Sequence, residues 1–278
     1  MISGEMKAKL TSLERRLSSL GSAVIAYSGG LDSTFLAKVA HDVLGQKALA
    51  VTACSETYPI REQEKALETA REIGLRHRLI QTSELEIPGF TDNPVDRCYF
   101  CKNELFSTLR KTAAEEGLLH ILDGTTADDL GDLRPGRRAA AEFGVISPLL
   151  EAGLKKTEIR VLSKKLGLPT WDKPASACLA SRIPYQSAIT PEKLRQIELA
   201  EEHLRSLGIV QCRVRHHGEV ARIEVAAEDI PRVCGPLRLE IVSCLRSLGF
   251  IYVTVDLSGY RPGSMNEVLG KIAPKITI

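Results

Sequence analysis

The stretch 24–33, VIAYSGGLDS, constrains the fold more than any other part of this 278-residue chain. Residues 24–26 form a short apolar run typical of a buried strand, and residues 31–43 have the pattern of a helix. Between them, Gly29 and Gly30 let the backbone turn tightly and approach a ligand without a Cβ atom in the way. The sequence therefore predicts a strand, a glycine turn and a helix that begins at the turn.

This turn has the composition of an anion-binding site. The first N–H groups of a helix and its dipole attract phosphate, and Ser28 and Ser33 add hydroxyl donors. Asp32 would repel phosphate unless a Mg²⁺ ion lay between them, so it predicts a metal. The motif is not a Walker A loop, which needs a longer glycine loop and a lysine, and it lacks the G-x-G-x-x-G dinucleotide pattern. We expect phosphate at Ser28, Gly29, Gly30 and Ser33, with Mg²⁺ at Asp32.

Ser-Gly-Gly-x-Asp-Ser after an apolar strand resembles the PP-loop of the ATP pyrophosphatases. The resemblance implies that ATP is cleaved between its α- and β-phosphates and that AMP is transferred to a substrate oxygen. The phosphate site itself is predicted by the residues, whereas the bond that is cleaved is implied by the resemblance.

Composition sets broad limits on the function. The length suits one large or two ordinary domains, and a hydrophobic content of 44% suffices for a packed core. The formal net charge of +2 is a weak argument for or against nucleic acid. Neither a signal sequence nor an apolar run of transmembrane length is visible, so we expect a cytoplasmic protein without a membrane partner. Seven cysteines in that setting favour thiols, metal binding or catalysis over disulfides.

Strand and helix patterns alternate over residues 1–170, which predicts an α/β fold with a parallel, doubly wound sheet and helices on both faces. Ligands of such sheets bind at the carboxyl ends of the strands. The expected strands are 24–26, 47–52, 78–81 and 121–122, and residues 145–150 are expected to form a fifth strand or an extended segment. The expected helices are 6–20, 31–43, 59–73, 98–116 and 157–166.

The pattern changes in the last third of the chain. Residues 168–189 are irregular, with three prolines and the only tryptophan, and such long irregular segments are often functional. We expect residues 171–189 of this stretch to link the two domains. Residues 190–278 then predict a small α+β domain in the order α-β-β-α-β. Its expected helices are 190–207 and 229–248, and its expected strands are 209–215, 221–226 and 250–255.

Two polar segments lie near the predicted sheet edge. Residues 123–129, DGTTADD, either hold Mg²⁺ or a ribose or simply cap a helix. Residues 131–138, GDLRPGRR, place three arginines in a predicted loop, as an anion clamp or as a solvated surface.

The C-x-x-C pair of Cys98 and Cys101 falls on the first turn of a predicted helix, where the helix dipole lowers thiol pKa values. Cys178 lies in the irregular segment. Three thiolates suit a four-iron cluster with one open iron, or an incomplete zinc site. The alternatives are a chance spacing for the pair and a small buried residue for Cys178. We expect the remaining cysteines to be core or near-core thiols: Cys54, Cys212, Cys234 and Cys244.

Taken together with the PP-loop, five segments resemble the LarE family over essentially the whole chain. The resemblance implies an ATP-dependent sulfurtransferase that adenylates the two carboxylates of pyridinium-3,5-biscarboxylic acid mononucleotide in turn. Sulfur then displaces AMP and stays as a thiocarboxylate, in the biosynthesis of the nickel-pincer nucleotide of lactate racemase. A homo-oligomer is also implied. The five segments are CYFCK (98–102), DGTTADD (123–129), RPGRRAA (134–140), PASACLASRIPY (174–185) and RVRHHGEVARIE (213–224).

The family supplies sulfur in two ways, and this chain has cysteines that match each of them. Some members sacrifice one cysteine, which becomes dehydroalanine, and Cys178 matches that donor position. Others hold an iron–sulfur cluster on three cysteines and donate a sulfide from the open iron. Cys98 and Cys101 place this chain with the second kind, so a [4Fe–4S] cluster on Cys98, Cys101 and Cys178 is expected, with the source of fresh sulfide left open.

Further roles follow from the resemblance. Gly124 and Asp128 line the nucleotide pocket, and Arg182 neutralises the adenylate or the substrate carboxylate. Arg213 and Arg215 lie on one face of a strand and match the binders of the substrate phosphate, although a solvated strand face would explain them nearly as well. For two further pairs we favour solvated surfaces over metal binding or catalysis: Glu201 with Glu202, and His216 with His217.

Three other functions fit parts of this pattern. A PP-loop tRNA thiolase would use the same three cysteines, but no added RNA-binding domain is visible and the low charge argues against nucleic acid. A nucleotide-binding regulator would hold structural zinc instead of a cluster. A synthetase that uses ammonia would leave the cysteines without a role.

Overall fold

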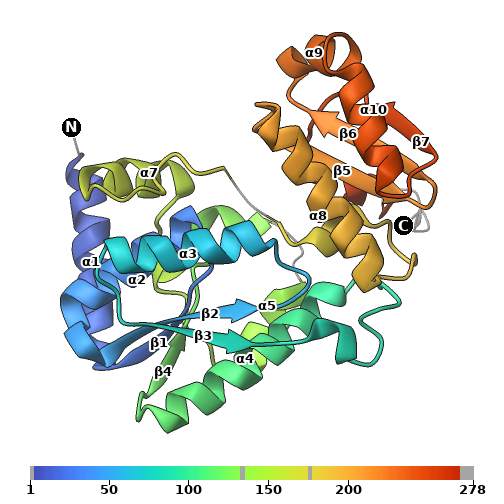
Figure 1. The fold of residues 1–278 in the computed structure, drawn as a ribbon. Helices are drawn as coiled ribbons and strands as arrows, with labels where there is room; N and C mark the ends of the chain where they lie inside the picture. The colour runs from blue at the N-terminus through green and yellow to red at the C-terminus, as the bar shows by residue number, and fades with distance from the viewer. Residues whose placement is uncertain (1–2, 132–134, 175–176, 270–278) are drawn as a thin grey trace, which may run out of the picture. The chain divides into compact units, whose positions relative to one another are not determined.

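The computed structural model describes residues 3–131, 135–174 and 177–269. The chain divides into two compact units, shown in Figure 1. The first comprises Met1–Ile87 and Asp96–Ala177, and the second comprises Pro88–Val95 and Cys178–Ile278. The predicted boundaries at 170 and 190 lie on either side of the point where the units divide.

The first unit is built on a four-stranded parallel sheet in the order β3-β2-β1-β4. This arrangement confirms the predicted α/β class and places β1, the strand before the glycine turn, in the interior of the sheet (Figure 1). The strands are β1 (Ala23–Ala26), β2 (Ala48–Cys54), β3 (His77–Gln81) and β4 (His120–Leu122).

Helices cover both faces of this sheet. Alternate residues of β1 enter different cores: Ala23 and Ile25 pack with α1, α2 and α7, whereas Val24 packs with α4 and α5. A strand buried on both faces reads as a continuous apolar run. The helices are α1 (Gly4–Leu20), α2 (Leu31–Leu44), α3 (Ile60–Glu72), α4 (Arg97–Glu115), α5 (Pro135–Glu142), α6 (Pro148–Glu151) and α7 (Lys156–Lys165). Short 3₁₀ turns are η1 (Gly45–Lys47), η2 (Glu84–Glu86) and η3 (Ala127–Gly131).

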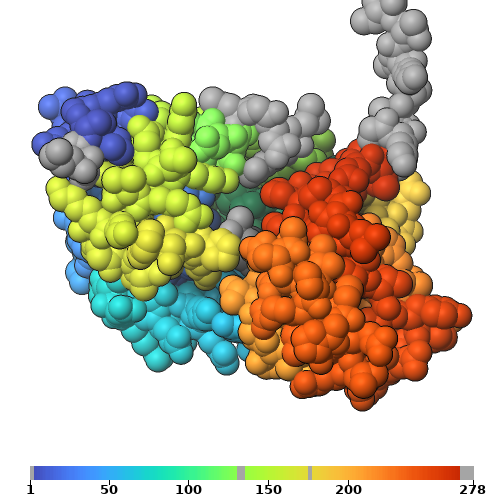
Figure 2. Space-filling model, turned by 90° about the horizontal axis from the view of Figure 1, so that it is seen from above, coloured from blue at the N-terminus to red at the C-terminus, as the bar shows by residue number. Residues whose placement is uncertain are grey.

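The helix α7 lies beside α1 in both views (Figure 1, Figure 2). Lys9 of α1 forms an ion pair of 2.9 Å with Glu158 of α7. Buried side chains of both α1 and α7 belong to the main hydrophobic core of the first unit. The helix α7 is therefore packed firmly against the helices that cover the sheet. Residues carried by α7 therefore have defined positions relative to the sheet.

Two predictions for the first unit need correction. For residues 145–150, predicted as a fifth strand or an extended segment, the strand is reduced to one parallel bridge of Ile146 with Leu122, and the extended conformation ends where Pro148 starts α6. Part of the predicted arginine loop 131–138 is helical, since α5 begins at Pro135 and continues into a run of alanines. Proline is well suited to the first position of a helix, and alanine to its interior. The remaining arginine of that loop, Arg134, lies outside the described residues.

The second unit contains a three-stranded sheet in the order β5-β6-β7, which confirms the small α+β domain. The strands are β5 (Cys212–His217), β6 (Val220–Val225) and β7 (Tyr252–Val255). The helices are α8 (Pro191–Ser206), α9 (Ile230–Cys234) and α10 (Arg238–Ser247), with 3₁₀ turns η4 (Leu179–Arg182), η5 (Ala227–Asp229) and η6 (Ser264–Asn266). The predicted helix 229–248 is two helices, since the chain leaves helical geometry at Gly235, with φ −107° and ψ −103°.

The segment Pro88–Val95 packs with the second unit although first-unit residues precede and follow it. Buried Asn93 donates to the carbonyls of Ile183 and Pro184 at 3.1 and 2.7 Å. The Ile189 amide donates to the Thr91 carbonyl at 2.8 Å. These bonds tie the segment to the irregular stretch that follows Cys178.

The seven cysteines are all thiols rather than disulfides. Cys54 and Cys212 are buried and Cys244 is partly buried, as predicted, but Cys234 is exposed, so its assignment to the core is wrong. No helix among the described residues is long and apolar enough to cross a membrane.

Candidate active site

The predicted phosphate turn lies at the carboxyl end of β1. Gly29 adopts φ +65°, and a Cβ atom there would lie 2.6 Å from the Cβ of Ala66 on α3. The next residue, Gly30, has φ −82° and caps α2, whose first bond runs from the Thr34 amide to the Gly30 carbonyl at 3.0 Å. The turn thus needs glycine at Gly29 for both conformation and space, and it aims the N-terminus of α2 at the sheet edge.

Two serines meet across this turn. The Oγ atoms of Ser28 and Ser33 lie 3.1 Å apart, and the Ser28 amide donates to Ser33 Oγ at 3.2 Å. Ser33 is buried, whereas Ser28 is exposed. The bonds hold both hydroxyls at the start of α2, as an oxyanion site requires.

Asp32 lies on the first turn of α2 and is largely buried. The pKa of its carboxyl is raised to about 6, mainly by burial. Lys156 and Arg160 lower this pKa, and the carboxylates of Asp129 and Asp128 raise it. Its Oδ1 atom is buried without a hydrogen-bond partner in the described part of the chain. A buried carboxylate oxygen without a partner is costly unless a cation binds it, so this residue fits the predicted Mg²⁺.

The end of β4 approaches this turn closely. A Cβ atom on Gly124 would lie 3.1 Å from the Ser33 amide nitrogen, so only glycine lets the two segments meet without a shift. The preceding carboxylate, Asp123, is buried and accepts bonds from Thr125 Oγ1 at 2.8 Å and Ser147 Oγ at 2.6 Å. The structure thus places Gly124 against the phosphate turn, where the resemblance assigns it to the nucleotide pocket.

The carboxylates of Asp128 and Asp129 are held by the start of α7 and by residues of their own segment, 123–129. The Lys156 amide donates to Asp128 Oδ2 at 2.6 Å, and Lys156 Nζ lies 3.3 Å from Asp129 Oδ1. Thr126 is buried and donates to Asp129 through its amide and hydroxyl at 2.9 and 3.0 Å. Asp128 therefore also orders the start of α7.

Sequence analysis missed three cations around the turn: Lys156, Arg160 and Lys173. Lys173 Nζ donates to the Gly29 carbonyl at 3.0 Å and pairs with Glu62 of α3 at 2.9 Å. Lys173 lies in a segment without periodicity, so no pattern placed it; its only signal was its position five residues before Cys178.

Cys98 and Cys101 lie on the first turn of α4, as predicted, and their spacing puts them on one side of the helix. Cys98 is exposed and Cys101 is partly buried, with its Sγ 3.8 Å from the carboxylate of buried Glu84. Thr57 and Thr82 also donate to Glu84, at 3.2 and 3.3 Å. Cys101 thus has a defined orientation, whereas Cys98 faces solvent.

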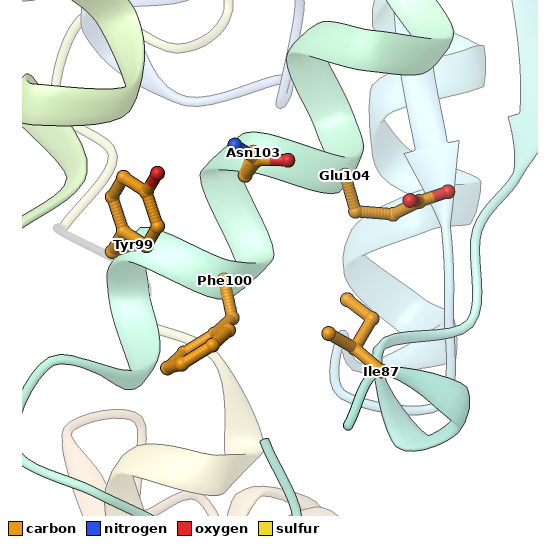
Figure 3. A pocket seen from close by; sticks show the side chains of 5 residues that line it. All are labelled: Ile87, Tyr99, Phe100, Asn103 and Glu104. Carbon is orange, nitrogen blue, oxygen red and sulfur yellow. The ribbon is translucent and has the colours of Figure 1, made fainter. Parts of the chain in front are cut away.

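A pocket of about 180 Å³ adjoins this cysteine turn. Figure 3 shows four of its residues projecting from α4 with Ile87 opposite them. The four are Tyr99, Phe100, Asn103 and Glu104.

In the second unit, Cys178 is partly buried and precedes η4. Its carbonyl accepts bonds from Arg182 Nη1 at 2.9 Å and from Ser181 Oγ at 2.7 Å. Arg182 is 1% exposed and forms a two-bond ion pair with Glu201, at 2.8 and 3.1 Å. The guanidinium therefore holds the backbone of the predicted sulfur donor.

The favoured solvated surface is wrong for Glu201, which is completely buried, whereas Glu202 is exposed. Burial alone would raise the pKa of Glu201, but the charges of Arg182, Arg213 and Arg205 hold it below the ordinary value. The carboxylate stays ionised because cations surround it.

Arg213 and Arg215 lie on one face of β5, and both are buried, so the solvated strand face is wrong. Arg215 pairs with Glu224 at 2.6 Å and donates to the Ser181 carbonyl at 3.2 Å. The Arg213 guanidinium lies 5.3 Å from the ring centre of Tyr260. This face thus adjoins the turn that follows Cys178.

The two predicted surface histidines differ from each other. His217 is exposed, as predicted, but His216 is buried and lies 2.9 Å from Gln196. The solvated surface is therefore wrong for His216.

Within the described ranges, no three His, Cys, Asp or Glu side chains are gathered as a metal site. Cys98 and Cys101 belong to the first unit, and Cys178 begins the main part of the second. A single turn of α4 thus offers two of the three predicted thiolates.

Comparison with known proteins agrees with this geometry. Residues 10–131 match the asparagine synthase family, a range that contains the glycine turn and the 123–129 segment. The pyridinium-3,5-bisthiocarboxylic acid mononucleotide synthase of Lactiplantibacillus plantarum is 39% identical over 267 residues, 96% of each chain. The chain belongs to the LarE family.

Membership of the LarE family makes the chain an ATP-dependent sulfurtransferase with a PP-loop. An uncharacterized protein of Synechocystis sp. is 48% identical over 96% of this chain and 100% of its own length. A glutamine-hydrolysing GMP synthase of Aeropyrum pernix is 26% identical over 221 residues, 73% of this chain and 43% of the relative.

The two glycines of the PP-loop should respond differently to alanine. Gly29→Ala should destabilise the first unit by about 2 kcal/mol or more, because it adds a positive-φ Cβ in collision with Ala66. Gly30→Ala, whose added Cβ lies no closer than 3.4 Å to another atom, should cost far less. Urea denaturation measures both, and equal losses would contradict this account of the turn.

Asp32→Asn should stabilise the metal-free protein at pH 8. The carboxyl pKa is 3.8 in the unfolded reference and about 6 in the folded chain. The folded state therefore binds more protons between these values and loses stability as the pH rises through them. At pH 8 the ionised group costs ~3 kcal/mol, and at pH 5 about half of that.

Urea denaturation with chelator at both pH values measures the gain, and the exposed Asp172→Asn is the control. A gain independent of pH, or none, would refute the assigned burial cost. The same variant should lose Mg²⁺-dependent ATP turnover.

Proposed function

We propose that this chain converts the two carboxylates of pyridinium-3,5-biscarboxylic acid mononucleotide to thiocarboxylates, in the biosynthesis of the nickel-pincer nucleotide. The observation that carries the proposal is the 39% identity over 96% of both chains to the bisthiocarboxylic acid mononucleotide synthase. The PP-loop geometry supports it, since carboxylate activation by ATP is the chemistry that such a turn serves.

The first step is adenylation of a substrate carboxylate. A carboxylate oxygen attacks the α-phosphorus of ATP, the bond to the β-phosphate breaks and pyrophosphate leaves. The N-terminus of α2 and the hydroxyls of Ser28 and Ser33 stabilise the charge on the departing group. Mg²⁺, which Asp32 would hold, neutralises further phosphate charge when bound. Gly124 and Asp128 border the nucleotide.

The second step transfers sulfur. A thiolate or sulfide attacks the acyl carbon, and AMP leaves with the former carboxylate oxygen, so one C–S bond replaces one C–O bond. A neutral thiol is too weak a nucleophile for this step. The negative charge of the attacking sulfur is thus a requirement on whichever group donates it.

We infer that the donor group is a [4Fe–4S] cluster held by Cys98, Cys101 and Cys178. Its open iron would supply sulfide for each round. The C-x-x-C turn supports this assignment, because sacrifice of Cys178 alone would give Cys98 and Cys101 no role. The exposure of Cys98 and the oriented thiol of Cys101 suit ligands that receive a cluster after folding.

The second unit supplies the remaining groups. Arg213 and Arg215 bind the phosphate of the substrate, with their shared strand face as support. The Arg182 charge is already balanced by Glu201, so we assign it a positioning role: it holds Cys178 rather than neutralising a substrate carboxylate.

Pyrophosphate release tests the reaction. With ATP, Mg²⁺, sulfide and the biscarboxylate nucleotide, two pyrophosphates should form for each bisthiocarboxylate product, because each carboxylate is activated once. A pyridinium mononucleotide with a single carboxylate should give one. No release with the nucleotide, together with release and base thiolation on tRNA, would establish the tRNA thiolase instead.

The sulfur donor is tested by anaerobic purification, iron and sulfide analysis, and intact mass before and after turnover. We expect bound iron and an unchanged mass, with iron lost in Cys98→Ala, Cys101→Ala and Cys178→Ala. The exposed Cys234→Ala is the matched control and should keep its iron.

Two outcomes would overturn the cluster. Absence of iron with loss of one H₂S from Cys178 during turnover would show that this cysteine is consumed. Zinc without iron, and no pyrophosphate release, would show a structural metal in a protein that is not a sulfurtransferase of this kind.

A further inference from the structure

A lysine from outside the PP-loop motif reaches the phosphate turn. Lys173 Nζ donates to the Gly29 carbonyl at 3.0 Å and pairs with Glu62 Oε2 at 2.9 Å. The side chain of Lys173 is only 16% exposed and that of Glu62 19%, whereas most lysines extend into solvent. This ammonium is therefore a built-in part of the turn's surroundings.

The backbone that carries Lys173 is held in place independently. Arg160 of α7 donates to the carbonyls of Trp171 and Lys173, at 2.9 and 3.1 Å. Lys164, one helical turn later, covers the ring of Trp171 at 4.1 Å. Since α7 is tied to the core, these contacts preset the reach of Lys173 toward Gly29.

The position of the ammonium suits phosphate oxygens. An ammonium has three N–H donors, and within the described residues Gly29 and Glu62 take two of them. The third donor is left for a ligand at the turn. A compact cation beside the N-terminus of α2 would add to the charge stabilisation there, and a polyphosphate carries more negative charge than Glu62, with which it would compete.

We propose that Lys173 binds the β- and γ-phosphates of ATP and stabilises the pyrophosphate as it leaves. The assignment rests on the proposed function only in taking ATP as the nucleotide. Lys173 stands where the segment that leads to Cys178 begins. Lys173, which would hold the leaving group, therefore lies only five residues before Cys178, the predicted sulfur donor.

Nucleotide binding to the full-length chain tests this. Isothermal titration with Mg²⁺ and an ATP analogue whose α,β bridge is methylene measures the triphosphate, and AMP measures binding without the β- and γ-phosphates. Lys173→Gln should weaken the analogue about 10- to 100-fold, as expected for loss of a charged hydrogen bond, and leave AMP unchanged. Lys165→Gln, which removes an exposed lysine of α7 that plays no part in holding Lys173, should change neither affinity.

Lys173→Arg, which keeps the charge, should recover part of the lost affinity. Equal affinity of wild type and Lys173→Gln for the analogue would overturn the assignment. Equal weakening of the analogue and AMP would also overturn it, because it would show a structural role. A failure to thiolate the biscarboxylate nucleotide would refute the proposed function but leave this comparison of ATP and AMP sites intact.

Discussion

Close approach of backbone at the carboxyl end of β1 is the constraint on which the nucleotide half of the protein depends. Two contacts leave little room for a side chain: Gly29 packs on Ala66 of α3, where an added Cβ would collide, and Gly124 packs tightly on the Ser33 amide. They bring the ends of two parallel strands, the start of α2 and the middle of α3 to one point. The helix N-terminus, the hydroxyls and the carboxylate of the site follow from that packing.

The charges around the phosphate turn favour ligand binding, and they reduce the stability of the fold when no ligand is bound. Asp32 is buried with an oxygen that has no partner among the described residues, and its pKa is raised to about 6. Lys156 and Arg160 of α7 act on this carboxyl, and Lys173 binds the Gly29 carbonyl in the same turn. Carboxylates and carbonyls of the fold hold these three cations. Such an arrangement costs stability without ligand and is relieved when metal and phosphate bind.

The second unit holds a reactive segment by its backbone. Arg182 and Glu201 form a fully buried pair that reaches Cys178 through its carbonyl. A buried pair adds little net stability, but loss of either partner costs ~3–5 kcal/mol because the other charge stays buried. The pair therefore fixes geometry more than it stabilises the fold, and it leaves the thiol of Cys178 available for chemistry.

The sequence by itself determined the α/β class, the small α+β unit, the PP-loop and the pairing of Cys98 with Cys101 on one helical turn. These features depend on local periodicity, glycine conformation and short spacings, which neighbouring residues encode. Tertiary structure alone decided which charges are buried and which distant groups meet. Glu201 looked like a solvated residue because its own helix pattern says nothing of Arg182, which precedes that helix in an irregular segment. Lys173 had no pattern at all, since its place at Gly29 depends on α7 holding an aperiodic segment against the sheet edge.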